Sequence, residues 1–403
     1  MRSTFKVVLL SIGVLFGICS VRPAPAQVLQ TAYDFQTVQP HPYVHALGNA
    51  TVAASGYSGA IGVNPATVGT EGTVRIGSNV NLSDAPLYSS PGISTSFADY
   101  WIAAPSATVK MGSWAGAAQV KHFSRGSLEI RSPQGERLYT VNVFEQSIKL
   151  AGAYDATSAL TVGGAINLLR SRGLYQEGKG VKTHPTFDLG VHYQTRMEQA
   201  LVALHPSGGL SITDFGGNVS IQDRPGERAA PTTIRGGGAL DVTSQSKQFG
   251  RPEWRIGLYG ALSNLLVSGE FKEENGRTYF EADGPFRALY SGWGTTKGVI
   301  GPAGERSTIG TWERITKHVG MEMSVLDILS LRLGRFHESD DNGGRQYTAL
   351  GFGLDAYYVS LDASWTLGDE EPFQQFSYGR LTVRIPLSDS PRNFWPALLG
   401  NGE

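Results

Sequence analysis

The first candidate for a chemical site is the glycine-rich stretch at residues 173–180, Gly-Leu-Tyr-Gln-Glu-Gly-Lys-Gly. This stretch is close to a phosphate-binding loop, in which spaced glycines precede a Lys and a Mg²⁺-binding Ser or Thr. Gly180 stands where that hydroxyl is needed, and no helix pattern follows to supply backbone N–H donors. We therefore interpret residues 173–180 as a loop tip and not as a nucleotide site.

A second candidate is the acidic cluster Glu338, Asp340, Asp341 and Asn342, which precedes two glycines. A calcium-binding loop needs a later Glu at a fixed distance, and this sequence lacks it. The cluster is expected to be a solvated acidic loop. Weak contact with a divalent cation or with lipopolysaccharide is the minor alternative.

The eight histidines are scattered along the chain. Only His41 and His45 are four residues apart, and Pro42 between them argues against a helix that would align them as metal ligands. No G-x-S-x-G nucleophile motif occurs, and Cys19 is the only cysteine. The sequence thus predicts no catalytic residue, no cofactor and no metal site.

The remaining charges of interest lie inside segments that alternate apolar and polar residues. In the stretch 318–365, for example, Leu329, Leu331 and Leu333 are separated by Ser330 and Arg332. Such alternation predicts β-strands with one apolar and one polar face. If the apolar faces meet lipid, the charges must point into a lumen, because an Arg or Lys facing lipid at the midplane costs about 2–4 kcal/mol. The predicted lumen-facing charges are of mixed sign, which favours pairing with one another or with the N-terminal segment: Lys149, Asp188, Arg255, Arg332, Asp362, Arg380 and Arg384.

The same period-2 pattern predicts about fourteen strands between residues 73 and 387. Long connections follow the odd-numbered strands, at about 83–104, 124–143, 171–186, 216–232, 266–311, 337–345 and 367–375. Most other connections are short, with 195–207 and 243–254 as exceptions. Long outer loops and short periplasmic turns are typical of an antiparallel up-and-down transmembrane barrel. The predicted fold class is therefore all-β, with both chain termini on the periplasmic side.

The N-terminus predicts export. Residues 1–26 have a basic start, an apolar core and a small-residue cleavage site at Ala24-Pro25-Ala26, which together are typical of a signal peptide. Cys19 falls inside this segment, so we expect neither a disulfide nor thiol chemistry in the mature chain. Without Arg2, Lys6 and Arg22, 31 basic residues remain against 35 acidic ones, a formal charge of −4. That balance argues against a nucleic-acid partner.

Residues 27–72 alternate poorly and are rich in small residues, with Asn64-Pro65-Ala66 near their end. They are either an irregular segment with a proline turn or a hatch that folds into the lumen. Residues 73–387 form the predicted barrel, and residues 388–403 form a C-terminal periplasmic tail. The loop 266–311 carries a hairpin signal at Asn275-Gly276. Its aromatic residues form either a packed loop core or a contact surface for a partner: Tyr279, Phe280, Phe286, Tyr290 and Trp293.

Several of these segments resemble the PorV/PorQ family of outer-membrane barrels, relatives of the FadL-type transporters. The strongest similarity lies in residues 343–354, which read Gly-Gly-Arg-Gln-Tyr-Thr-Ala-Leu-Gly-Phe-Gly-Leu, and in residues 359–365. Residues 209–216, 121–126, 46–50 and the Asn64-Pro65-Ala66 hatch motif are also similar. The chain departs from the family's pattern after its last strand, since it continues to Glu403 instead of ending in an aromatic residue.

The resemblance implies a fourteen-stranded FadL-type barrel in the bacterial outer membrane, in contact with outer-membrane lipid. It also implies protein partners from the type IX secretion system: the translocon, a PorU-like surface protease, and cargo with C-terminal signal domains. A secretion-accessory barrel that hands cargo to the attachment machinery is therefore the favoured hypothesis. The alternative is a FadL-like channel for hydrophobic small molecules, which predicts an apolar pocket between residues 27–72 and the wall. A structural barrel without cargo is the third possibility.

Overall fold

A computed structural model describes residues 31–69, 72–81, 100–131, 136–172, 181–220, 226–248, 250–274, 277–300, 306–342, 344–356, 358–367 and 377–387. The predicted signal peptide (1–26), the glycine-rich loop tip (173–180), the turn residues Asn275-Gly276 and the C-terminal tail (388–403) lie outside these ranges.

The described strands form one closed antiparallel barrel. β1 (Thr73–Asn81) pairs with β24 (Ser377–Pro386), and β9 (Val202–Phe215) pairs with β12 (Thr233–Ser244), which closes the ring. β2 (Tyr100–Ala103) and β3 (Ser106–Met111) together occupy one place beside β4, so fourteen strand positions surround the lumen in the described part. The other members are β4 (Trp114–Arg131), β5 (Arg137–Asp155), β6 (Leu160–Arg172), β7 (Val181–Gln194), β15 (Trp254–Leu265), β20 (Ile315–Val325), β21 (Leu329–His337), β22 (Gln346–Asp355) and β23 (Val359–Leu367). The predicted all-β barrel of fourteen strands is confirmed.

Strands of the barrel itself run well into three of the predicted loops. β2 lies inside the predicted loop 83–104, and the paired ends of β4 and β5 occupy most of 124–143. β6 and β7 likewise extend into 171–186. In the β4–β5 ribbon the register shifts between Ser124 and Ser127, beside Gly126 with its positive φ of 76°. Such a bulge interrupts the alternation from which the strand ends were predicted.

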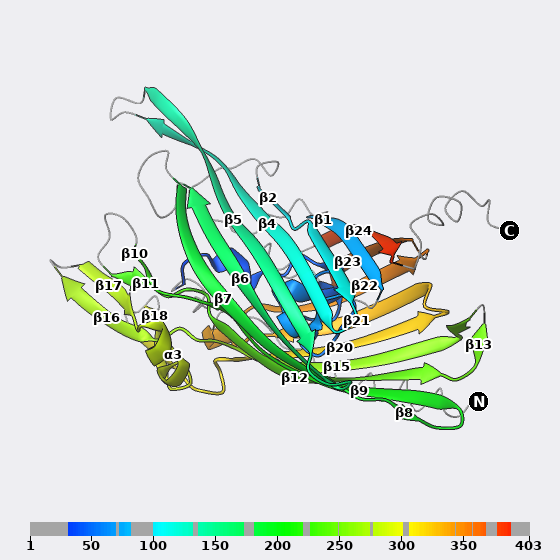
Figure 1. The fold of residues 1–403 in the computed structure, drawn as a ribbon. Helices are drawn as coiled ribbons and strands as arrows, with labels where there is room; N and C mark the ends of the chain where they lie inside the picture. Colours follow the sequence, from blue (N-terminus) through cyan, green and yellow to red (C-terminus); the bar gives the residue numbers. More distant parts are fainter. Residues whose placement is uncertain are drawn as a thin grey trace.

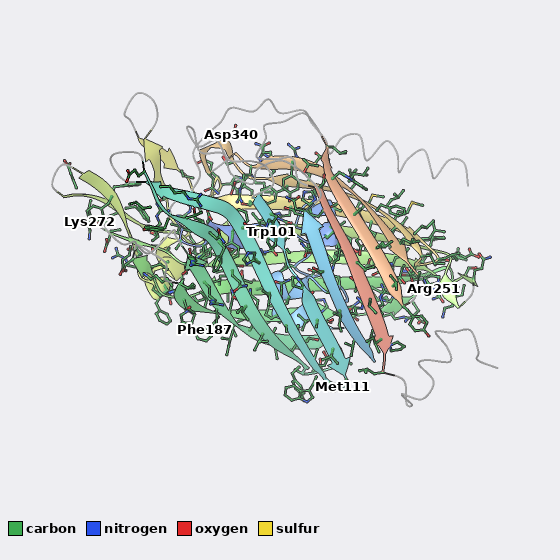
Figure 2. All side chains as sticks on the ribbon, turned by 90° about the horizontal axis from the view of Figure 1, so that it is seen from above. Trp101, Met111, Phe187, Arg251, Lys272 and Asp340 are labelled. Carbon is green, nitrogen blue, oxygen red and sulfur yellow. The ribbon has the colours of Figure 1, made fainter. Side chains whose placement is uncertain are left out.

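The two faces of the wall differ as the alternation requires. On β21, Leu331 is 59% exposed on the outside whereas Arg332 is 7% exposed on the inside. Phe187 on β7 and Leu381 on β24 are also exposed and apolar, and Figure 2 shows the Phe187 side chain on the outer surface. An apolar outer band around a polar interior is the arrangement of a barrel that crosses the bacterial outer membrane.

The two ends of the barrel are unequal. Short connections lie at one end, with the small β8 (Met197–Glu198), β13 (Lys247–Gln248) and β14 (Arg251–Pro252). The other end carries the long loops, which contain β10 (Val219–Ser220), β11 (Glu227–Arg228), β16 (Gly269–Glu274), β17 (Arg277–Ala282), α3 (Pro285–Ser291), β18 (Thr296–Ile300), β19 (Arg306–Ile309) and the 3-10 turn η6 (Asp340–Asn342). Lys272 and Arg251 in Figure 2 mark these opposite ends. By the usual orientation, the short-turn end is periplasmic.

Residues 31–69 lie inside the barrel, as the blue segment of Figure 1 shows. They form a chain of short helical turns, η2 (Asp34–Thr37), α2 (Pro42–Ala46), η3 (Ala60–Gly62) and η4 (Pro65–Thr67). Most of their side chains are buried against the wall. We call residues 31–69 the plug. Among the described residues, no helix has the length and apolar character needed to cross a bilayer.

Candidate functional site

The plug contacts the wall where the wall carries glycine. Asn64 donates from Nδ2 to the carbonyl oxygens of Val52 (2.9 Å) and Val191 (3.1 Å), and its Oδ1 accepts from the amide N–H of Ala66 (3.0 Å). A Cβ on Gly190 would overlap Asn64 Oδ1. The plug backbone therefore approaches the wall more closely than a side chain would permit, and Asn64 fastens the two together.

Pro65 and Ala66 meet the wall in the same place. A Cβ on Gly163, which pairs with Gly190 across β6 and β7, would lie 2.5 Å from the carbonyl carbon of Pro65. Pro65 is the first residue of η4, where a missing N–H is no loss. The three residues of the predicted hatch motif thus form one rigid turn seated on a glycine pair.

Helix α2 makes the second plug contact. His41 caps the helix, since its Nδ1 accepts from the N–H of Tyr43 at 3.2 Å, and Pro42 occupies the first turn. The expectation that Pro42 prevents a helix between His41 and His45 was wrong, because proline is well accommodated at a helix start. His45 Nδ1 lies 3.0 Å from Ser364 Oγ. Burial lowers the pKa of His45 to about 3 and that of His41 well below its usual value, so both rings are neutral.

The first group of predicted lumen charges lies between β5, β7 and β9. Lys149 Nζ lies 2.6 Å from Asp188 Oδ2 and 3.7 Å from Asp214. Asp188 Oδ1 also accepts from the amide N–H of Asp214 at 2.7 Å, and Asn167 donates to Asp214 Oδ1. Asp188 is 1% exposed, and these partners satisfy both of its buried carboxyl oxygens.

A second group surrounds Glu322 on β20. Arg332 Nε donates to Glu322 (2.5 Å) and Arg332 Nη1 to Asp362 (2.8 Å), while Arg255 Nη2 lies 2.7 Å from Glu322. Arg255 also contacts Asp327 at 3.2 Å. The predicted pairing of mixed charges is therefore present here: each of these side chains has an opposite charge beside it.

Arg380 on β24 forms hydrogen bonds both to the plug and to the residues between β2 and β3. Its Nε donates to Ser58 Oγ of the plug (3.0 Å), its Nη2 to Ser106 Oγ (2.7 Å) and its Nη1 to the carbonyl oxygen of Ala104 (3.4 Å). The side chain is 3% exposed. Ser106 Oγ donates in turn to the Ser58 carbonyl oxygen at 3.1 Å. This guanidinium bridges the plug and the junction between β2 and β3.

That junction is a discontinuity in the wall. β1 pairs with β2 through one residue pair, Val80 with Ala103, and has no ladder with β3 in the described residues. Pro105 stands between β2 and β3, and its carbonyl oxygen accepts from the Val120 N–H of β4 at 3.0 Å, so the wall is continuous on the β4 side and interrupted on the β1 side. We call this place the β1–β3 seam.

A cavity of about 280 Å³ lies between the plug and the short-turn end of the wall. Arginines, carboxylates and hydroxyl groups dominate its lining, which includes Arg75, Arg384, Asp355, Asp362 and Thr382. The pocket that a hydrophobic channel predicts in this place should be apolar, and this cavity is charged. Asp355 and Arg384 form an ion pair within it.

The aromatic residues of loop 266–311 divide into two sets. Phe280 packs against a small cluster with Val267 and Ala282, and Tyr279 is half-buried beside it. Phe286 and Tyr290 on α3 are 72% and 82% exposed, and Trp293 is 39% exposed. The predicted hairpin is present as β16 paired with β17. The loop thus has both a packed core and an exposed aromatic face.

The acidic cluster is more structured than expected. Glu338 is 3% exposed and forms a two-point ion pair with Arg345, at 2.8 and 3.0 Å. Asn342 is also buried and donates to the Arg314 carbonyl oxygen. The interpretation as a solvated loop was therefore wrong for these two residues, because Arg345 follows in sequence and folds back. No group of metal ligands occurs among the described residues.

Sequence reasoning did not single out Glu322, Arg75 or Ser58. For Glu322 the signal was available, since it alternates with Met321 and Met323 and so shares the polar face. Ser58 carries no such signal, because its importance comes from Arg380, which is 322 residues away along the chain.

No protein-family model and no curated protein matches the chain. Among solved structures, the toluene transporter TbuX of Ralstonia pickettii is similar over 85% of this chain and 96% of its own, at 10% identity and a TM-score of 0.41. The toluene transporter TodX of Pseudomonas putida covers 86% and 97%, at 12% identity and 0.40. A Pseudomonas aeruginosa FadL homologue covers 85% and 97%, at 10% identity and 0.39.

The class of the protein follows from its own strand pairing and side-chain faces. Fourteen strand positions close around an N-terminal plug, with apolar side chains on the outer face and paired charges on the inner face. The protein is a plugged transmembrane β-barrel of the kind that crosses the bacterial outer membrane.

Proposed function

We propose that this barrel admits hydrophobic small molecules and releases them sideways into the membrane through the β1–β3 seam. The observation that supports the proposal is the missing ladder between β1 and β3 at Pro105. Elsewhere in a barrel, continuous pairing excludes passage through the wall, because every unpaired backbone group in lipid is costly.

The charged cavity fits lateral release better than axial release. Arg75, Arg384 and Asp355 line the space between the plug and the periplasmic end. An apolar solute that entered it would displace polar contacts and gain none. A hydrophobic molecule therefore has the seam as its exit, and Arg380 is the contact that must loosen when the plug shifts.

The test locks the seam with a disulfide. Val80→Cys with Ala103→Cys joins the one described register pair of β1 and β2, so uptake of N-phenyl-1-naphthylamine by intact cells should fall toward that of cells without the protein and should recover on reduction. Val74→Cys with Ile385→Cys is the matched control, because this register pair lies in the unbroken ladder of β1 and β24. Equal uptake by the two oxidised variants and the unaltered protein, each heat-modifiable on gels, would contradict the proposal.

A second candidate function is the secretion-accessory role that the PorV/PorQ resemblance implies. The observation in its favour is the exposed aromatic face of α3, with Phe286 and Tyr290, on a loop with its own packed core. If this face contacts a cargo's C-terminal signal domain, Phe286→Ser with Tyr290→Ser should abolish cross-linking to that purified domain. Unchanged cross-linking would reject this role for the α3 face.

A further inference from the structure

Two arginines near the long-loop end of β6 face away from the lumen. On the inner face of this strand, Leu169 and Ser171 are 0% and 1% exposed. The alternation therefore places Arg170 and Arg172 on the outer face, where both are half-buried. The preceding outward residue, Leu168, is apolar and 41% exposed. The outer face of β6 thus changes from apolar to basic where the strand leaves the lipid-facing band.

Aromatic side chains lie beside these arginines on the outer face of the neighbouring strands, which run side by side in Figure 1. Arg172 is the register partner of Phe144 on β5. The Phe144 ring stacks on His122 of β4 with centroids 5.4 Å apart, and the His122 ring lies 4.9 Å from that of Trp101 on β2. Aromatic rings at the edge of an apolar band mark the level of the lipid head groups. The arginines therefore stand where charged head groups lie.

The outer face supplies no negative charge to this pair. Arg170 Nη1 donates to Gln146 Oε1 at 3.2 Å, and the amide is neutral. The Nε of Arg172 is buried without a hydrogen-bond partner. Glu145, next to Gln146 along β5, points to the lumen and is 0% exposed. Among the described outward side chains of β4 to β7 there is no carboxylate, so this part of the surface carries an excess of two positive charges.

We propose that Arg170 and Arg172 bind a phosphate group carried by a lipid of the outer leaflet. A guanidinium presents its N–H donors in a planar fork that fits phosphate oxygens. The apolar face continues from the arginines through Leu168, so one lipid covers both parts of the surface: its phosphate contacts the arginines, and its acyl chains contact the apolar side chains. A free anion would contact the arginines alone. The site lies outside the wall and is independent of what passes through the seam.

The experiment measures lipid binding by native mass spectrometry, with the full chain in detergent and a diphosphorylated, hexaacylated glucosamine disaccharide as the probe. Arg170→Gln with Arg172→Gln should raise the apparent Kd about tenfold or more, because charge-assisted hydrogen bonds to the phosphate are lost. Arg196→Gln with Lys247→Gln is the control of equal charge change. Both of these side chains are exposed at the short-turn end, so the control should leave the Kd unchanged.

Two further titrations separate the phosphate from the rest of the lipid. The same lipid without its phosphates should bind the unaltered protein about tenfold or more weakly, and inorganic phosphate should not compete at the concentration of the lipid. Equal binding of both lipids, competition by inorganic phosphate at that concentration, or an equal Kd for the two double variants would overturn the proposal. If the glutamine double variant does not fold, Arg170→Lys with Arg172→Lys keeps the charge but loses the fork; it should still weaken binding, and an unchanged Kd would overturn the site.

Discussion

Substituting Gly190 by alanine should unseat the plug while leaving the barrel intact. The added Cβ would overlap Asn64 Oδ1, and Pro65 and Ala66 lie next to it, so the side chain cannot be accommodated by a small shift. One hydrogen bond of Asn64, to the Val191 carbonyl oxygen of β7, joins the plug to the wall at this position; its other two lie within the plug. At about 1 kcal/mol for that bond, together with about 1–3 kcal/mol for overpacking, the seated state should lose about 2–4 kcal/mol. This corresponds to a shift of about one and a half to three decades toward the displaced plug.

The assay is single-channel conductance in planar bilayers, in which a displaced plug opens the lumen to ions. Gly190→Ala should show long-lived openings that the unaltered protein rarely shows. Gly164→Ala is the matched control, since it lies one residue from Gly163 on the same strand and its Cβ would meet Asp188 O at an ordinary 3.5 Å. Conductance and thermal unfolding of Gly190→Ala equal to those of Gly164→Ala would refute the argument that wall glycines seat the plug.

Three further predictions concern other parts of the molecule. In the folded protein the pKa of His45 is about 3, against an ordinary value near 6.5. The neutral ring therefore stabilises the seated plug fully above pH 6.5, and this stabilisation is lost as the pH falls toward 3. The unfolding temperature should drop over this pH window, and His45→Gln should make the dependence of the unfolding temperature on pH flatter. Glu338→Gln should weaken the two-point ion pair with Arg345 by about 1–3 kcal/mol. Amide hydrogen exchange should then become faster, and only in residues 337–346. Unchanged exchange would show that the ion pair does not stabilise this loop. In a bilayer, Leu331→Cys should resist a water-soluble thiol reagent while Ser330→Cys, which lines the cavity, reacts from the periplasmic side; the reverse pattern would mean that the faces of the wall are assigned wrongly.

The strand order was predictable because a β-strand has a period of two and each strand of a barrel separates lipid from an aqueous interior. The alternation therefore assigns Leu331 to the outer face and Arg332 to the inner face, without information about the neighbouring strands. The same reasoning assigned Asp188, Arg332 and Arg380 to the polar faces. Strand ends were less predictable, as the β4–β5 ribbon shows, because beyond the membrane both faces can be polar.

Partnerships across the lumen required the tertiary structure. Arg380 meets Ser58 of the plug, Arg75 stands opposite Arg384, and Gly190 makes room for Asn64. No local pattern marks these pairs, because they depend on how the two ends of the chain close the barrel and on where the plug lies inside it. The alternation along the chain specifies which face each side chain occupies. The closure of the ring decides which charges neutralise one another and which glycines hold the plug.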